Sequence, residues 1–321
     1  MLRQKLKTLS RLLSRGGQGI PLAVFNNMVH LGFFDRVSDE RFLKLAFRAN
    51  VHAPLRLESP ETFNEKLQWL KIHDRNPLYT SMVDKIAVKE WVAQSIGEEH
   101  VVPTLACWDS AEAVDVSALP SRFVLKTNHD SGSVIVCNDK AYFDIESAKA
   151  TLDRALSRNL YLATREWPYK GVVPRIFAES HLADFYYSDA GSKESSGILV
   201  DIPDYKFMCF DGVVRSIFTC TSRMDDDLRV DFFDCEWNHM PFTRRYPNAD
   251  RIPKRPERLS DMIRLAESLS KEIPFVRVDF YEIGNRVFFG EMTFYPGSGF
   301  ERFEPIEWDY ALGSWLTLPR M

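Results

Sequence analysis

The stretch FVRVDFYEIGNRVFFGEMTFYPGSG, residues 275–299, is the part of the sequence that decides the fold. It contains two β-prone runs joined near Gly284, which is the pattern of a β-hairpin. Side chains two apart in a strand face the same way, so Arg277 and Asp279 share one face. A turn near Gly284 therefore predicts that Asp279 lies roughly opposite Glu291.

This pair of carboxylates is the first candidate for a functional site. Two such anions repel each other unless they are protonated or bridged by a cation. Asp279 and Glu291 are hard oxygen ligands of the kind that suits Mg²⁺ carrying phosphates. A second interpretation stays open, in which both are exposed strand acids and one is bonded to Arg277. The hairpin then stops abruptly in Pro, Gly, Ser and Gly, which predicts a tight turn.

Composition and charge narrow the class of protein. Of the 321 residues, 45% are hydrophobic and 27% are charged, which is typical of a globular protein with one large or two to three smaller domains. The net charge of −4 provides no basic field for a nucleic acid, so we expect no nucleic-acid partner. The five cysteines form no CxxC pair, which predicts neither a disulfide framework nor a zinc site. A reducing, cytoplasmic location fits best.

The N-terminal segment has a distinct character. Residues 1–15 contain five basic side chains, no acid precedes Asp35, and leucines recur at helical spacing. One interpretation is a solvated helix or a disordered arm. The other is a basic amphipathic helix, residues 1–16, that makes a peripheral contact with the inner face of a membrane. The apolar stretch that follows is too short for a transmembrane helix and does not resemble a secretory signal.

The remaining chain alternates between helical and β-prone segments. Helix signals occur at 59–73, 81–97, 145–165 and 259–273, and a further β-hairpin is predicted to turn at Phe210, Asp211 and Gly212. Strand pairs and helices interleave, which favours α+β layers over a doubly wound parallel sheet.

Two lysines on predicted strands add to the candidate site. Lys126 ends a strand and is followed by a small polar loop around Gly132, whose backbone N–H groups can cradle a phosphate; an ordinary hairpin loop is the alternative. Lys206 lies in the middle of an apolar strand and must either reach solvent or face an anion. With the carboxylate pair, these features fit a nucleoside triphosphate with Mg²⁺.

Taken together, the motifs resemble the ATP-grasp superfamily, and more closely its TupA-like branch of amide ligases encoded among capsule and surface-polysaccharide genes. In chain order they are SPETFNEKLQWLK, MVDKIAVKEWV, VLKTNHDSGSV, DYKFMCFDG, RVDFY, GEMTFYPGSGF and WDYALGSWL. The resemblance implies an α+β ATP-grasp fold, with two subdomains that grip ATP after a mainly helical N-terminal region. The implied division is a basic segment 1–40, a helical or α/β region 41–120, a subdomain 121–185 with the lid loop, and a subdomain 186–321 with the metal and substrate site.

The resemblance also implies roles for individual residues. Arg277 and Lys206 would be catalytic, with Arg277 stabilising the transferring phosphoryl group and Lys206 binding phosphate. Asp279, Glu291 and Thr293 would lie at the Mg²⁺ site. The residues implied for ATP are Lys85, Lys126, Ser131, Gly132, Ser133, Glu179, His181 and Leu182, of which the Ser-Gly-Ser stretch would close as a lid. Those implied for substrate are Ser298, Gly299 and Arg302.

Two positions depart from the family pattern. D-alanine ligases and many relatives have Asn where this chain has Thr293, and a hydroxyl is a poorer metal ligand, so the number of metal ions stays open. Asp130 lies in the lid loop where glycine is more usual. An acid beside triphosphate is unfavourable unless it points to solvent, so the geometry of the lid stays open.

The implied reaction is acyl activation. A substrate carboxylate attacks the γ-phosphate of ATP to give an acyl phosphate, and an amine then displaces phosphate to leave an amide. We expect the carboxylate to belong to a uronic acid, on a nucleotide sugar or a glycan, and the amine to an amino acid or small amine. Two alternatives stay open: a metal-dependent glycosyltransferase that uses Asp279 and Glu291, and a non-catalytic, membrane-associated assembly factor.

Overall fold

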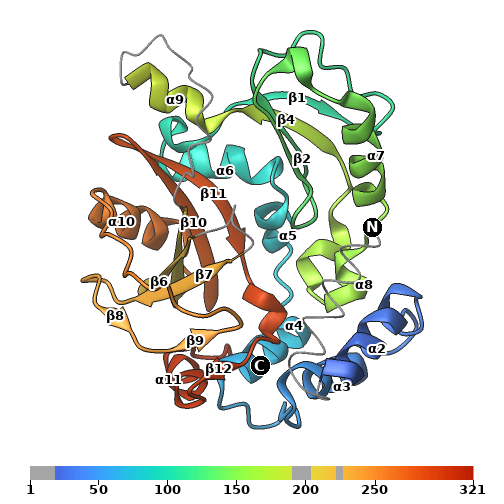
Figure 1. The fold of residues 1–321 in the computed structure, drawn as a ribbon. Helices are drawn as coiled ribbons and strands as arrows, with labels where there is room; N and C mark the ends of the chain where they lie inside the picture. The colour runs from blue at the N-terminus through green and yellow to red at the C-terminus, as the bar shows by residue number, and fades with distance from the viewer. Residues whose placement is uncertain (1–18, 190–203, 222–226, 321) are drawn as a thin grey trace.

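The computed structural model describes residues 19–189, 204–221 and 227–320 (Figure 1). The segment 1–16, for which an arm or a membrane helix is predicted, lies outside these residues. Within the described ranges, no helix combines the length and the apolar character that a membrane crossing needs.

The chain begins with helices that flank the later site. These are α2 (Gly19–His30), α3 (Asp39–Val51) and α4 (Phe63–His73). The helix predicted from residue 59 starts later, because Thr62 and Glu65 form a capping box: the Thr62 hydroxyl accepts from the Glu65 N–H, and the Glu65 carboxylate accepts from the Thr62 N–H.

The single helix predicted over 81–97 is wrong. The structure has two helices there, α5 (Leu78–Val83) and α6 (Ala87–Ile96). The break has a physical cause, since the Asp84 carboxylate accepts from the N–H groups of Ile86 and Ala87 and so caps α6. The same carboxylate accepts from the Asn128 side chain at 2.9 Å. Lys85 therefore lies in a junction fixed to the loop after a distant strand, and a short turn, η2 (Glu98–His100), follows α6.

The first sheet has four antiparallel strands in the order β1-β4-β2-β3. They are β1 (Thr104–Trp108), β2 (Phe123–Thr127), β3 (Val134–Cys137) and β4 (Ile176–Ser180). Helix α7 (Ile145–Leu156) buries Ala148 and Leu152 in a core with Phe123, Leu125 and Ile176 of this sheet. The helix predicted over 145–165 is likewise two helices, because Asn159 caps a separate α8 (Leu160–Thr164).

The second sheet has six antiparallel strands in the order β11-β10-β5-β6-β7-β8. They are β5 (Asp204–Phe210), β6 (Val213–Thr221), β7 (Arg229–Phe233), β8 (His239–Met240), β10 (Phe275–Ile283) and β11 (Arg286–Thr293). Both predicted hairpins are confirmed: β5 and β6 are joined at Asp211 and Gly212, and β10 and β11 at Gly284 and Asn285. Helix α10 (Leu259–Leu269) buries its apolar face in the core of this sheet.

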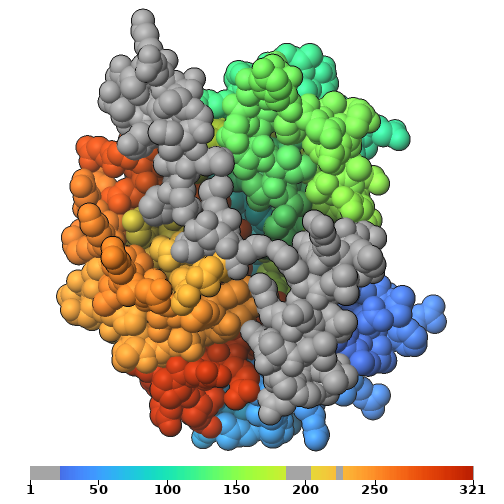
Figure 2. All heavy atoms as spheres, viewed as in Figure 1, coloured from blue at the N-terminus to red at the C-terminus, as the bar shows by residue number. Residues whose placement is uncertain are grey.

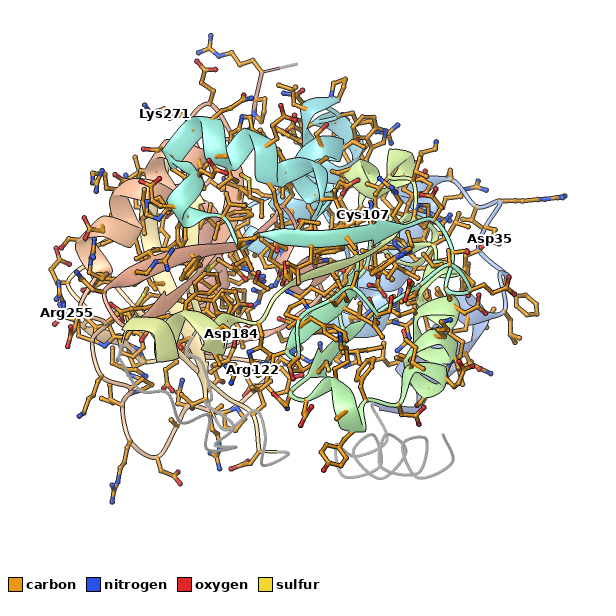
Figure 3. All side chains as sticks on the ribbon, turned by 90° about the horizontal axis from the view of Figure 1, so that it is seen from above. Asp35, Cys107, Arg122, Asp184, Arg255 and Lys271 are labelled. Atoms are coloured by element: carbon orange, nitrogen blue, oxygen red, sulfur yellow. The ribbon has the colours of Figure 1, made fainter. Side chains whose placement is uncertain are left out.

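Smaller elements complete the fold. They are η3 (Lys140–Tyr142), η4 (Trp167–Gly171), α9 (Leu182–Asp189), the pair β9 (Thr243–Arg244) and β12 (Phe303–Glu304), η6 (Pro296–Gly299) and α11 (Glu307–Trp315). Arg122, just before β2, forms an ion pair with Asp184 of α9, and the two side chains lie side by side in Figure 3.

Helices α5 and α6 lie between the two sheets in Figure 1. Figure 2 shows the same division on the surface, with the first sheet and α7 in green and most of the second sheet in orange to red. The observed layers are those of an α+β fold, as predicted.

The contact between α11 and α4 offers a test of this packing. A Cβ on Gly313 would lie 2.8 Å from the backbone N of Phe63 and closer still to the carbonyl of Glu61. We expect Gly313→Ala to lower the free energy of unfolding by about 1–3 kcal/mol, because backbone atoms cannot move aside without strain. Urea unfolding measures this, with Ser314→Ala on the exposed side of the same helix as the control. Equal stability of the two variants would contradict the packing.

Candidate active site

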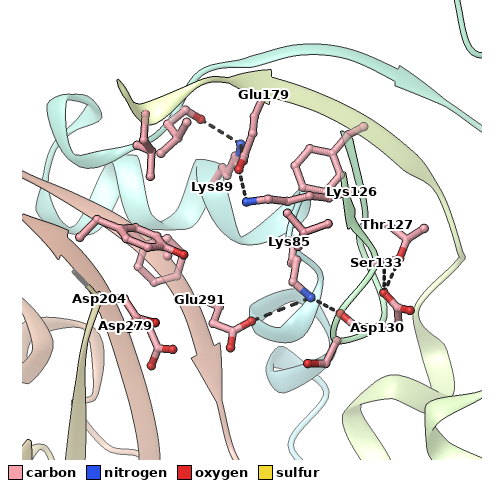
Figure 4. Close-up of a pocket in the computed structure, with 18 of the residues that line it drawn as sticks. Lys85, Lys89, Lys126, Thr127, Asp130, Ser133, Glu179, Asp204, Asp279 and Glu291 are labelled. Carbon is pink, nitrogen blue, oxygen red and sulfur yellow. Dashed lines mark hydrogen bonds and ion pairs between the residues drawn. The ribbon is translucent and has the colours of Figure 1, made fainter. Parts of the chain in front are cut away.

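A cavity of about 250 Å³ lies between the two sheets (Figure 4). Its walls come from both sheets, from the α5–α6 junction and from the loop between β2 and β3. The predicted site residues that line it are Lys85, Lys126, Ser131, Gly132, Ser133, Glu179, Leu182, Lys206, Asp279 and Glu291.

One wall is a row of three residues across the second sheet. The register pairs Asp279 with Glu291 on β11 and with Lys206 on β5, so the predicted opposition of the two carboxylates is confirmed. A β-bulge follows Asp279, and Gly290 lies in it. A Cβ on Gly290 would lie 3.1 Å from the Tyr281 ring, so glycine allows β11 to stay close to β10 at this point.

Arg277 neutralises the carboxylate pair. Its Nε and Nη2 donate to the two oxygens of Asp279 at 2.6 Å each, and Nη2 also donates to Glu291 at 2.7 Å. Burial alone would lower the pKa of Arg277, but Asp279 and Glu291 outweigh burial and raise it. Because Asp279 is only 3% exposed, the interpretation of two exposed acids is wrong for this residue. The Glu291 side chain is 36% exposed, and Arg277 is bonded to both acids.

Glu291 stays ionised in this setting. Burial raises the pKa of its carboxyl, but Lys85, Arg277 and Lys206 lower it further, to about 2. The Lys85 Nζ lies 3.9 Å from Glu291 and also donates to the backbone carbonyl of Asp130 in the loop after β2 (Figure 4). Lys85 therefore connects the carboxylate row to the opposite wall.

The opposite wall has its own shared carboxylate. Glu179 of β4 accepts from Lys126 of β2 and, at 3.0 Å, from Lys89 of α6. Burial raises the pKa of Glu179, but the two lysines outweigh it and the pKa is lowered. Sequence reasoning missed Lys89, although it follows Lys85 by four residues and the helical period would have placed both toward one side.

His181 and Leu182, two of the residues implied for ATP, differ in their position relative to the cavity. Leu182 lines the cavity beside Phe177. His181 does not line it, and its Nδ1 accepts from the N–H of Ala183 at 3.1 Å at the start of α9. Burial lowers the pKa of His181. The structure thus brings Leu182 to the cavity and leaves His181 outside it.

The loop between β2 and β3 has the composition predicted for a lid. Ser131 and Gly132 are exposed, and Gly132 has a φ of 93°, which favours glycine. Ser133 is buried, and its hydroxyl is 2.6 Å from that of Thr127. Ser133 is therefore engaged inside the loop.

Asp130, which left the geometry of the lid open, does not point to solvent. Asp130 is 4% exposed, and its carboxylate accepts from the hydroxyls of Thr127 and Ser133 beneath the loop. Arg158 supplies the balancing charge at 3.2 Å. An acid is compatible with this loop because its charge is paired with Arg158 and its oxygens accept from hydroxyls within the loop.

The tight turn after β11 is fixed by hydrogen bonds between Ser298 and two buried charged residues, Glu166 and Lys71. Gly297 and Ser298 both have left-handed backbones, with φ of 59° and 55°. The Ser298 hydroxyl donates to Glu166 at 2.6 Å, and its carbonyl accepts from Lys71 at 2.9 Å. Burial lowers the pKa of Lys71 to about 7 although Glu166 opposes this shift, and burial raises the pKa of Glu166.

The predicted substrate residues lie away from the first cavity. Ser298 lines a second cavity of about 270 Å³, together with Phe25, His30, Asn50 and Arg245. Gly299 is buried, and a Cβ there would lie 3.0 Å from Leu67. Arg302 is exposed and lines neither cavity.

The donor set fits a magnesium ion with phosphate ligands. Mg²⁺ is usually held by one or two carboxylates together with water and substrate phosphates, and Asp279 and Glu291 supply two carboxylates in one row. Thr293 is not among the residues that line the cavity, and its hydroxyl lies 3.4 Å from Glu291. Within the described ranges, no group of three or more His, Cys, Asp or Glu side chains is placed to hold a metal ion.

Sequence reasoning did not name Asp204 and Tyr281 as site residues, although both line the cavity. Asp204 precedes Lys206 by two residues on the same strand, and Tyr281 follows Asp279 by two. The period-2 rule that grouped Arg277 with Asp279 would have found both.

The low pKa of Glu291 gives a pH test on the ligand-free protein. Because folding lowers this pKa from 4.5, the stability that Glu291 contributes is fully present above pH 4.5 and is lost as the pH falls through about 2. The difference in free energy of unfolding between wild type and Glu291→Gln should therefore shrink as the pH falls below about 4.5. Urea unfolding at several pH values measures it, with the exposed exchange Glu304→Gln as control. A difference independent of pH would contradict the assignment.

The chain is similar to one family of known proteins. The family model described as TupA-like ATPgrasp matches residues 65–317. None of the curated proteins compared matches the chain.

Solved structures give weaker likenesses. D-alanine–D-alanine ligase from Bacillus anthracis, complexed with ATP, has 11% identity and a TM-score of 0.36, covering 66% of this chain and 53% of that one. The chain thus spans about half the length of that ligase. The Helicobacter pylori enzyme of the same name has 14% identity, a TM-score of 0.38 and coverages of 80% and 69%. D-cycloserine synthetase DcsG has 16% identity, a TM-score of 0.38 and coverages of 86% and 78%.

The family model, which extends over most of the chain and includes both walls of the cavity, decides the assignment. The predicted resemblance is confirmed: the chain belongs to the TupA-like ATP-grasp family.

Proposed function

We propose that the chain is an ATP-dependent carboxylate–amine ligase. The observation that carries this proposal is the cavity itself. The row of Glu291, Asp279 and Lys206 forms one wall, and Lys126 and the lid loop form the other. Cations for phosphates and carboxylates for a metal ion thus meet in one space, within a member of the ATP-grasp family.

The residues divide into those that bind nucleotide and those that hold the metal. Lys85, Lys126 and Lys206 supply positive charge for phosphates, and the exposed N–H groups of Ser131 and Gly132 lie at the cavity edge. Asp279 and Glu291 would hold Mg²⁺, which when bound neutralises phosphate charge. Leu182 and Phe177 offer an apolar surface for the base.

The protein contributes positioning and charge to the reaction. The substrate carboxylate attacks the γ-phosphorus of ATP and ADP leaves, which gives an acyl phosphate. The amine then attacks the acyl carbon, phosphate leaves, and the nitrogen loses a proton. Arg277, fixed beneath the row by three short hydrogen bonds, keeps positive charge next to the transferring group. Closure of the lid excludes water from an acyl phosphate that hydrolyses readily.

The proposed substrates are a uronic-acid carboxylate, on a nucleotide sugar or glycan, and an amino acid or small amine, in capsule or surface-polysaccharide assembly. The second cavity beside Ser298 is the proposed place for the acceptor, because it adjoins the turn that follows the carboxylate strand. The proposed location is cytoplasmic, with residues 1–16 in peripheral contact with the inner membrane face.

A product assay tests the reaction class. With Mg²⁺-ATP, uronic-acid nucleotides and a panel of amino acids, ADP and phosphate should appear only when carboxylate and amine are both present. A glycosyltransferase would ignore ATP, and a non-catalytic assembly factor would release no ADP. Failure of Mg²⁺-ATP to raise the unfolding temperature at all would overturn the proposal.

Removing one carboxylate of the row tests the metal-dependent part. Asp279→Asn should abolish most of the thermal stabilisation by Mg²⁺-ATP and lower ADP release by about 100-fold or more, because the charge that would hold the metal is lost. The control is Asp250→Asn, which changes the same side chain at an exposed position. Equal nucleotide stabilisation in both variants would exclude Asp279 from the site.

A further inference from the structure

Lys206 is held between two carboxylates. Its Nζ donates to Asp279 at 2.6 Å and to Asp204, which lies two residues earlier on β5. The Lys206 side chain is 12% exposed and each Asp side chain 4%. Asp204 is opposite Tyr281 on β10, and Lys206 is opposite Asp279, so the strand register itself builds this arrangement.

The arrangement has the form of a cation site whose cation is part of the chain. Asp204 and Asp279 would repel each other without a positive charge between them. The Lys206 Nζ donates a hydrogen bond to each of the two carboxylates, so its positive charge lies between them. A metal ion entering between these carboxylates would have to expel a buried ammonium that already neutralises them.

We propose that Lys206, held by Asp204 and Asp279, takes the place of a second metal ion, so that the site binds nucleotide with one divalent cation. This inference rests on the proposed ATP-dependent function. The single ion would lie on the Glu291 side of Asp279. Asp204 is then a positioning residue, because it keeps hold of Lys206 when Asp279 turns an oxygen to the metal.

The β11 end of the row, at Glu291, also favours a single metal ion. A second ion there would need a ligand beyond Glu291, and the next residue on that face of β11 is Thr293. Its hydroxyl does not line the cavity, and its partner in the ladder is Arg277, whose guanidinium is bonded to both carboxylates. The Arg277 guanidinium thus already places a positive charge next to Thr293, where a second metal ion would have to bind.

Counting bound metal tests the proposal without reference to activity. Mn²⁺ is titrated into the protein with a non-hydrolysable ATP analogue, and free Mn²⁺ is followed by electron paramagnetic resonance. We expect one Mn²⁺ per chain at saturation, after correction for Mn²⁺ carried by unbound analogue. Two per chain would overturn the proposal and leave the ligase function intact. No binding of the analogue at all would overturn the proposed function, and this inference with it.

Variants test whether Lys206 is the residue that prevents a second metal ion from binding. Lys206→Met vacates the space between Asp204 and Asp279 with a side chain of similar length, and we expect a second Mn²⁺ to bind. The double variant Lys206→Met/Asp204→Asn should return to one. Lys85→Met removes the same charge from the same cavity without freeing a pair of carboxylates, and should stay at one. One Mn²⁺ in Lys206→Met, in protein that unfolds cooperatively and binds the analogue, would also contradict the proposal.

Discussion

The sharing of buried carboxylates between cations is the constraint on which the site depends. Asp279 is buried on β10, the second strand of a six-stranded sheet, where an unpaired carboxylate would be strongly destabilising. Arg277 on the same strand and Lys206 on the next strand remove that penalty, and Glu291 shares Arg277 with it. The strand order β11-β10-β5 therefore does more than complete a sheet, because it places Glu291 and Lys206 on either side of Asp279.

The same principle governs the opposite wall, and this explains how the site can exist without its ligand. Glu179 is shared by Lys126 and Lys89, and Asp130 is paired with Arg158. The carboxylates thus hold Lys126 and Lys89 in place, and the phosphates of the proposed nucleotide would compete with these carboxylates. A site arranged in advance needs little reorganisation when charge develops during reaction, which is the main electrostatic advantage of a folded active site.

The sequence predicted well what depends on short-range rules. The opposition of Asp279 and Glu291 followed from a period of two and a tight turn, and the structure has that register. The α5–α6 break escaped prediction because Asp84 is held by Asn128, 44 residues further along the chain. The position of Asp130 stayed open for a similar reason, since its partner Arg158 comes from beyond α7. Long-range partners of single polar side chains leave no periodic signal, so these residues could not be placed from pattern alone.

The two cavities differ in how they are built, and this bears on how specificity can arise. The residues around the first cavity all lie within the range of the family model, 65–317. The second cavity draws Phe25 and His30 from α2 and Asn50 from α3, which precede that range. Ser298 lines only the second cavity, but its strained turn directly follows the carboxylate strand, and its hydroxyl is fixed by Glu166. A change in the N-terminal helices can therefore reshape the second cavity without disturbing the charged row, which separates the proposed choice of acceptor from the proposed activation by ATP.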